Sequence, residues 1–180
     1  MTAAPSPRDD IAEVIATEVE IRHAVRRLAA ALTEDVGDLS PILVGVLNGA
    51  FVFLADLVRQ LDFPLEIDFI NASSYGESTV GDRVEIETDL SLDVKGRHVV
   101  IVDDILDTGQ TLQGLVAHVT ERGAATVRTC CLLDKPARRT VDFEADYVGI
   151  EIPDRFVVGY GLDFAQRHRN LPFIGVLRPE

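Results

Sequence analysis

Residues 98–111 read HVVIVDDILDTGQT. Positions 98–102 are almost wholly apolar and predict a buried strand, and Asp103 and Asp104 follow at its carboxyl end. A helix that continues to about residue 122 is predicted to begin at Thr108 and Gly109, just after a third carboxylate, Asp107. Because ligands of open α/β sheets bind beyond the carboxyl ends of the strands, this stretch predicts a binding site.

The chemistry of these residues indicates a phosphorylated sugar as the ligand. Backbone N–H groups at a helix start, with the hydroxyls of Thr108 and Thr111 beside them, are suited to a phosphate group. Asp103 and Asp104 are suited to the hydroxyl groups of a sugar, or to a divalent metal ion that holds one. The alternative is structural, with the two acids only capping the turn that follows. A P-loop is excluded, because no Gly-x-x-x-x-Gly-Lys-[Ser/Thr] occurs.

The rest of the chain continues this alternation of strands and helices. Thr17 and Glu20 form a predicted capping box, and apolar residues at helical spacing extend that helix to about residue 33. A second helix is expected over 51–58. Strands are predicted at 42–47, 65–70, 84–90, 127–133, 147–150 and 156–158, with a mobile loop at 73–82. This order is typical of an α/β fold with a mainly parallel central sheet flanked by helices on both faces.

The composition sets limits on the class of protein. The chain has 180 residues, 17 Lys+Arg against 30 Asp+Glu, and a formal net charge of −13. This length predicts a single domain over 1–180, with a disordered end at 1–10. The acidic balance argues against nucleic-acid binding, and the longest near-apolar stretch, 42–55, is too short for a membrane span. The adjacent Cys130 and Cys131 are typical of a reducing compartment, so a cytoplasmic location is expected.

The stretch VVIVDDILDTGQT, residues 99–111, resembles the phosphoribosyl-pyrophosphate (PRPP) motif of the type I phosphoribosyltransferases. Within that family, the chain is similar to the hypoxanthine-guanine branch over about residues 11–179. The matching segments are LNGAF (47–51), SSYG (73–76), LLDK (132–135), DRFVVGYGLD (154–163) and RNLPFIGVL (169–177). The first motif is specific to the superfamily, and the set is specific to the branch.

The resemblance implies a purine salvage enzyme. A 6-oxopurine base and PRPP would give IMP or GMP and pyrophosphate, in a Mg²⁺-dependent transfer with oxocarbenium character at the anomeric carbon of the ribose. It also implies the type I phosphoribosyltransferase fold with a small hood formed near the termini, and a homodimer or homotetramer. A xanthine-preferring homologue, or a regulatory, nucleotide-sensing protein of the same fold, is the alternative.

The resemblance assigns roles to the PRPP motif. Asp103 and Asp104 would hold the 2′- and 3′-hydroxyls of the ribose, directly or through Mg²⁺. The carboxylate of Asp107 would face N7 of the purine and accept its proton, unless it is a turn carboxylate that bonds its own backbone. The 5′-phosphate would be bound by the loop residues Asp107, Thr108, Gly109, Gln110 and Thr111.

On the base side, the resemblance implies that Lys135 donates to the 6-oxo group of the purine. Phe156 would stack on the ring, and backbone groups of Val157 would bind its edge. The alternative for Lys135 is a solvated lysine, which the polar stretch at 136–139 supports. The alternative for Phe156 is an ordinary core aromatic.

The pyrophosphate would be bound at two further places. Asp163 would hold a second Mg²⁺ against it, and Arg169 would pair with its oxygens, unless both are plain surface charges. The strand-end loop at Asn48 and Gly49 would contact it through backbone N–H groups, although the family often has Lys at position 48. A lid over the site is implied at 73–76, which includes Ser74 and Tyr75.

Three other classes of protein share parts of this pattern. RNA-binding attenuators of the same fold keep the phosphate motif but do not match the base-binding segments. A receiver domain would carry its Asp-Asp pair near the N-terminus, whereas here the pair lies at 103–104. The adenine, xanthine and orotate branches are the nearest enzymatic alternatives, and the segments at Lys135 and 156–163 favour the hypoxanthine-guanine branch.

Overall fold

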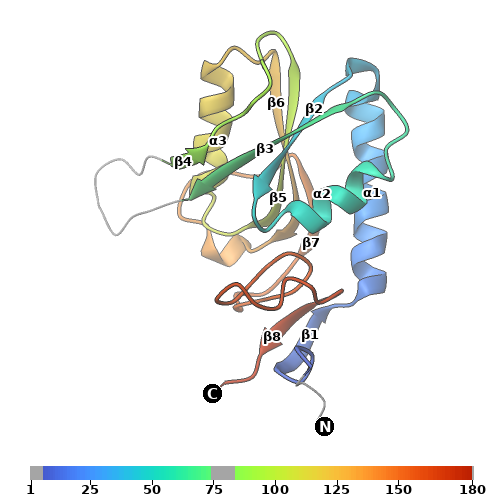
Figure 1. Ribbon diagram of the computed structural model, residues 1–180, viewed down its shortest axis with the longest axis vertical. Helices are drawn as coiled ribbons and strands as arrows, with labels where there is room; N and C mark the ends of the chain where they lie inside the picture. Colours follow the sequence, from blue (N-terminus) through green and yellow to red (C-terminus); the bar gives the residue numbers. More distant parts are fainter. Residues whose placement is uncertain (1–5, 74–83, 180) are drawn as a thin grey trace.

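The computed structural model describes residues 6–73 and 84–179. Within them, a six-stranded sheet has the order β4-β3-β2-β5-β6-β7 (Figure 1). All neighbouring pairs are parallel except β3 and β4, so the mainly parallel α/β sheet is confirmed. The strands are β2 (Ile42–Leu47), β3 (Glu66–Ser73), β4 (Glu85–Thr88), β5 (His98–Leu106), β6 (Thr126–Asp134) and β7 (Tyr147–Glu151).

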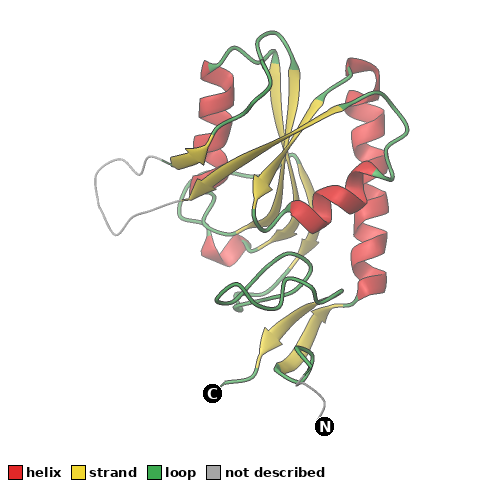
Figure 2. Ribbon diagram, viewed as in Figure 1, coloured by secondary structure: helices red, strands yellow, loops and turns green. Residues whose placement is uncertain are grey.

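Helices cover both faces of this sheet, as predicted (Figure 2). Helices α1 (Glu18–Val36) and α2 (Phe51–Val58) pack on one face, and α3 (Gln110–Glu121) packs on the other. Alternate residues of the central strands serve the two layers: Val100 faces α1 and α2, whereas Ile101 faces α3. Two short 3₁₀ turns, η1 (Gly37–Leu39) and η2 (Pro136–Arg138), complete the helical segments.

The predicted capping box begins α1. The N–H of Glu20 donates to Oγ1 of Thr17 at 3.3 Å, and the N–H of Thr17 donates to Oε2 of Glu20 at 2.8 Å. These two bonds satisfy donors that the first turn of a helix leaves without intrahelical partners. The helix runs to Val36, one turn beyond the predicted end.

Strand β5 is longer than predicted, and the difference matters for the site. It continues to Leu106, so Asp103 and Asp104 lie within the strand rather than after it. The reason is that β6 pairs with β5 as far as Leu106, whereas the pairing with β2 ends at Val102. The carboxylates therefore lie on a part of β5 that no longer pairs with β2.

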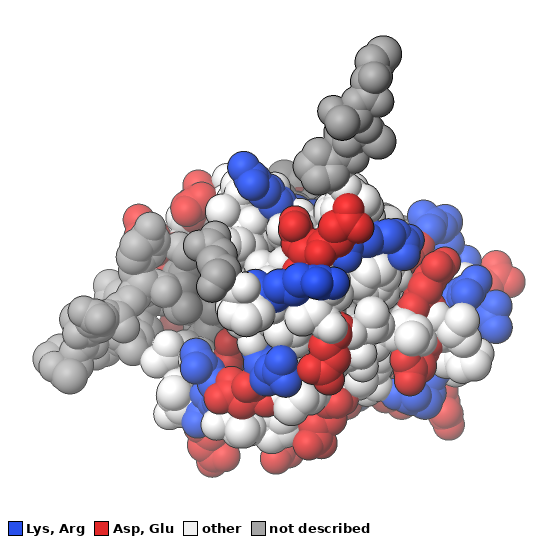
Figure 3. Space-filling view, turned by 90° about the horizontal axis from the view of Figure 1, so that it is seen from below, with Lys and Arg blue, Asp and Glu red and all other residues white. Residues whose placement is uncertain are grey.

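The hood is built from β1 (Ile11–Ala16) near the N-terminus and from the segment that follows β7, residues 152–179, which contains the hood loop (152–173) and β8 (Ile174–Leu177). Strands β1 and β8 form a separate antiparallel pair below the central sheet (Figure 1). Neither strand was predicted. The strand predicted at 156–158 is reduced to one bridge, in which Val158 and Gly175 exchange hydrogen bonds of 2.8 and 2.9 Å. Seen from the hood side, acidic and basic side chains are intermingled (Figure 3).

Part of the expected disordered end is folded. Residues 6–10 form a turn in which the N–H of Ser6 donates to the carboxylate of Asp9 at 3.1 Å, and that of Ile11 donates to the carbonyl of Arg8 at 3.2 Å. The turn is held in place because Ile11 is the first residue of β1. The rest of the predicted end and most of the predicted loop at 73–82 lie outside the described residues.

Candidate active site

Two neighbouring carboxylates lie near the end of β5 with little positive charge to balance them. Asp103 is buried, and its Oδ1 accepts a hydrogen bond of 2.9 Å from the N–H of Asp104. Burial and the neighbouring Asp104 raise the pKa of Asp103 well above its ordinary value. Burial also raises the pKa of Asp104, although a hydrogen bond with the side chain of Asp103 and the positive charge of Arg169 both act to lower it. A cation or hydroxyl donors bound at such a pair would stabilise its charged form.

The turn after β2 lies directly against Asp104. A side chain at Gly49 would bring a Cβ within 1.7 Å of Oδ2 of Asp104, so this position has no room for one. A Cβ at Gly161 of the hood would in turn lie 2.0 Å from the carbonyl oxygen of Gly49. The peptide bond between Leu47 and Asn48 is cis. Sheet and hood therefore meet at backbone distance around Asp104.

The PRPP motif borders a cavity of about 300 Å³. Gly109, the N-cap of α3, has a φ of +90°, a conformation that suits glycine and turns the chain sharply from β5 into the helix. The cavity is lined by the turn at Gly49 and by the residues that follow the sheet. The predicted residues in its wall are Gly49, Asp103, Asp104, Asp107, Thr108, Gly109 and Thr111.

A second cavity of about 270 Å³ lies between the sheet and the hood. It shares Gly49, Asp104, Ile105 and Asp107 with the first cavity, so the two adjoin at these residues. A ligand that spans both would place its central part beside Asp104 and Asp107. The predicted residues in the wall of this cavity are Asn48, Gly49, Asp104, Asp107, Lys135, Phe156, Val157, Asp163 and Arg169.

The structure places Lys135 and Phe156, two of the predicted base-side residues, at the wall of the second cavity. Lys135 is buried, which excludes the solvated lysine, and its Nζ lies 4.0 Å from Oδ2 of Asp107. Phe156 is 60% exposed, which excludes a core role, and its ring and that of Phe164 form a T-shaped pair with the centroids 5.7 Å apart. An exposed aromatic face beside a buried cation can hold a flat ring with an acceptor on its edge.

Asp163 and Arg169 are engaged with each other in this structure. Oδ1 of Asp163 lies 2.8 Å from a guanidinium nitrogen of Arg169, and its Oδ2 accepts from the N–H of Gln166 at 2.8 Å. Arg169 also donates to the carbonyl of Gly161 at 2.7 Å. The pair is therefore part of the hood loop, with both charges at the wall of the second cavity.

Two cavities bring together nearly all of the predicted site residues that the structure describes. Gln110, the first residue of α3, is the exception among them, because it lines neither cavity. Ser74 and Tyr75 of the predicted lid lie outside the described residues.

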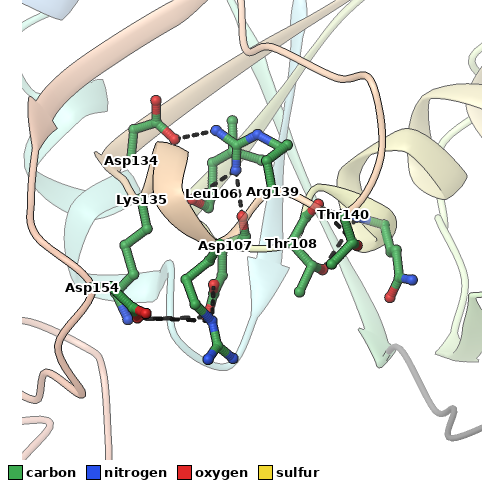
Figure 4. A network of polar contacts seen from close by, with 10 residues as sticks. Leu106, Asp107, Thr108, Asp134, Lys135, Arg139, Thr140 and Asp154 are labelled. Carbon is green, nitrogen blue, oxygen red and sulfur yellow. Dashed lines mark hydrogen bonds and ion pairs between the residues drawn. The ribbon is translucent and has the colours of Figure 1, made fainter.

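Sequence reasoning missed a polar network behind the PRPP motif (Figure 4). Arg138 lies 3.2 Å from Oδ1 of Asp107 and 3.9 Å from Oδ1 of Asp154. Arg139 pairs with the carboxylate of Asp134 and donates to the carbonyl of Leu106 at 3.3 Å. The two adjacent arginines after Lys135 were a visible signal, but the sequence does not distinguish inward from solvated arginines.

The comparisons with known proteins agree with this geometry. The profile of the phosphoribosyl transferase domain matches residues 14–165, which is most of the chain. The chain belongs to the phosphoribosyltransferase family. Among curated members, it is 49% identical to the hypoxanthine-guanine phosphoribosyltransferase of Bacillus subtilis (strain 168) over 173 residues, which cover 96% of each chain. It is 46% identical to the hypoxanthine phosphoribosyltransferase of Haemophilus influenzae, over 91% of this chain and 93% of the relative.

Solved phosphoribosyltransferases share the whole fold. A crystal structure of a hypoxanthine phosphoribosyltransferase from Staphylococcus aureus matches with a TM-score of 0.91 and 41% identity, over 98% of both chains. A hypoxanthine-guanine-xanthine phosphoribosyltransferase matches with a TM-score of 0.87 and 39% identity, over 95% of this chain and 99% of the other. The type I phosphoribosyltransferase fold with its terminal hood is thereby confirmed.

Proposed function

We propose that this phosphoribosyltransferase is a purine salvage enzyme that converts hypoxanthine or guanine and PRPP into IMP or GMP and pyrophosphate. One observation carries the proposal: the cavity lined by the PRPP loop and the cavity lined by the buried Lys135 adjoin at Asp107. A ribose between them joins the 5′-phosphate on one side to the base on the other. The names of the relatives support the same substrates.

On the PRPP side, Asp103 and Asp104 hold the ribose hydroxyls. The 5′-phosphate is bound by N–H groups and hydroxyls of the loop, namely Asp107, Thr108, Gly109, Gln110 and Thr111. The helix start behind this loop favours negative charge, which helps an acidic protein to bind an anion.

A magnesium ion fits Asp103 and Asp104. Magnesium in phosphate-transfer sites is usually held by one or two carboxylates together with substrate oxygens rather than by a full protein cage. The described residues supply such carboxylates side by side, with Asp103 buried and Asp104 partly buried. When bound, the ion supplies positive charge to the leaving pyrophosphate. Asp163 is the candidate for a second ion, although it is paired with Arg169 here.

On the base side, Asp107 accepts the proton that leaves the purine, and Lys135 donates to the 6-oxo group. Phe156 stacks on the ring, and backbone groups of Val157 bind its edge. These roles fit the burial of Lys135 and the exposed ring of Phe156. The pyrophosphate is bound by Arg169 and by backbone N–H groups at Asn48 and Gly49.

We further propose that the single domain, 1–180, assembles as a homodimer or homotetramer in the cytoplasm. Phe51 of α2 and Ile67 and Phe69 of β3 are 41–46% exposed, and exposed large apolar side chains favour burial against another chain. Cys130 and Cys131 are buried and unpaired, which suits a reducing compartment. Among the described residues, no helix combines the length and apolarity that a membrane span requires.

The test is an assay with PRPP, Mg²⁺ and five bases, namely hypoxanthine, guanine, xanthine, adenine and uracil, with products identified by mass. IMP and GMP are expected, and chelation of Mg²⁺ should abolish their formation. If the main product came from xanthine, the enzyme would instead be a xanthine-preferring homologue, and xanthine is one of the bases in the name of a structural neighbour. No nucleotide product from any base would refute the proposal.

A further inference from the structure

A short segment runs along the outer side of the PRPP loop. We call residues 134–140 the strap; it comprises the end of β6, Lys135, η2, Arg139 and Thr140. Its backbone N–H groups donate to the loop at both ends: that of Lys135 to the carbonyl of Leu106 at 2.9 Å, and that of Thr140 to the carbonyl of Thr108 at 3.0 Å. The strap is thus fastened to the loop on either side of Asp107.

Arg139 fills the space between these two fastenings. One of its guanidinium nitrogens donates to the carbonyls of both Leu106 and Asp107, the former at 3.3 Å (Figure 4). The strap therefore holds the carbonyl oxygens of three consecutive loop residues, Leu106, Asp107 and Thr108.

Peptide geometry also determines the direction in which the N–H groups of the loop point. A trans peptide is planar and holds its C=O and N–H on opposite sides. The three carbonyls that face the strap therefore direct the N–H groups of Asp107, Thr108 and Gly109 away from it. The cavity of about 300 Å³ lies on that other side, since it is lined by these three residues and by none of residues 134–140.

Arg139 itself is held firmly. Its other guanidinium nitrogen donates to the carboxylate of Asp134, and the side chains of both residues are only 16% exposed. The packing is tight on the loop side as well, because a Cβ at Gly109 would lie 3.0 Å from Cδ of Arg139. A planar fork that binds a carboxylate and two carbonyls at once is a geometry that lysine does not reproduce.

We propose that Arg139, held by Asp134, is a positioning residue that aims the N–H groups of the PRPP loop at the 5′-phosphate of the substrate. This inference rests on the proposed function. Arg139 touches neither cavity, so it acts through the loop. The hydrogen bonds of the Arg139 side chain go to the loop and to Asp134 rather than to Lys135, so its loss is expected to affect the binding of PRPP far more than that of the base.

The test compares Arg139→Lys with Arg138→Lys. Arg138 is the matched control because it is adjacent, 51% exposed, and contacts the carboxylate of Asp107 rather than the loop carbonyls. Arg139→Lys is expected to raise KM for PRPP by about 10–100-fold, the range for charge-assisted hydrogen bonds, and to change KM for hypoxanthine less than threefold. Arg138→Lys is expected to change KM for PRPP less than threefold.

Two further measurements distinguish a wrong positioning role from a wrong proposed function and from a variant that does not fold. Binding of ribose 5-phosphate, measured by calorimetry, should weaken by the same factor in Arg139→Lys, whether or not the parent turns over a purine. If Arg139→Lys does not fold, Asp134→Asn, which keeps an acceptor but removes the charge, should still raise KM for PRPP selectively. Unchanged PRPP and ribose 5-phosphate binding in a folded variant, or an equal rise of KM for both substrates, would overturn the positioning role.

Discussion

At the scale of single residues, Asp107 lies where the two cavities adjoin. It lines both cavities, and two cations flank its carboxylate, with Nε of Arg138 at 3.2 Å and Nζ of Lys135 at 4.0 Å. The alternative of a turn carboxylate bonded to its own backbone is not what the structure shows, because its described partners are these two side chains.

We expect Asp107→Asn to lower kcat by about 10²–10⁴-fold, the usual contribution of a general acid or base, with little change in the affinity for PRPP. The measurement is steady-state kinetics with hypoxanthine, together with PRPP binding by calorimetry. Asp154→Asn is the control, since Asp154 contacts the same Arg138 but lines neither cavity. Normal turnover by Asp107→Asn would show that another group takes the proton.

The acidic pair gives a prediction for stability. The pKa of Asp103 is raised in the folded state by burial and by Asp104, so the folded protein binds a proton more readily than the unfolded chain. The ionised pair therefore lowers stability progressively as pH rises above the unfolded value of about 4. Asp103→Asn should raise the free energy of unfolding of the ligand-free protein at pH 7 by about 0.5–2 kcal/mol.

This gain should shrink as pH falls toward 4, because the parent carboxyl is then neutral as well. The same variant should bind PRPP with Mg²⁺ more weakly. Urea unfolding at pH 7 and pH 4 measures the first effect, and calorimetry the second. A ligand-free variant that is less stable than the parent at pH 7 would contradict the account of an unbalanced acidic pair.

At the scale of elements, the start of α1 was predictable because a capping box is local. Thr17→Ala should reduce the free energy of unfolding by about 1 kcal/mol, since the first turn loses a side-chain acceptor and the partner of Glu20. Thr120→Ala, whose exposed hydroxyl donates to a carbonyl within α3, should cost less than half as much. Both are measured by urea unfolding, and an equal effect would contradict the capping role.

Other elements depend on partners that the sequence does not reveal. The buried strands 42–47 and 127–133 were predicted almost to the residue, because a continuous apolar run is a local signal. The extension of β5 past Val102 was not, since it depends on how far β6 accompanies it. Strands β1 and β8 were missed because each is short and finds its partner more than 150 residues away.

The site shows the same division between local and distant information. The PRPP motif is continuous in sequence, so its cavity could be predicted from it. The burial of Lys135 could not, because the polar residues that follow it suggest solvent, and only the fold turns them toward the loop. A backbone contact at Gly49 was predicted from the sequence. The closeness of Gly49 to Asp104 was not, because it depends on where β2 ends relative to β5.

At the scale of the whole molecule, the cavity proposed for the sugar and phosphate lies at the sheet, and the cavity proposed for the base lies between the sheet and the hood. Phe156, Leu162, Asp163 and Arg169 of the second cavity all belong to the segment between β7 and β8. If the proposed assignment holds, selectivity for the base depends on the packing of the hood against the sheet, with Lys135 as the donor from the sheet side.

The most direct test of the account is the catalytic efficiency for hypoxanthine, guanine and adenine, in the parent and in Lys135→Ala. Lys135 has only donors, so it complements the 6-oxo group, whereas the amino group of adenine would leave two buried donors unpaired. The account predicts adenine below hypoxanthine by about 10⁴-fold or more, and a loss of about 10–100-fold on hypoxanthine in Lys135→Ala. Adenine used within tenfold of hypoxanthine, or hypoxanthine use unchanged in Lys135→Ala, would contradict it.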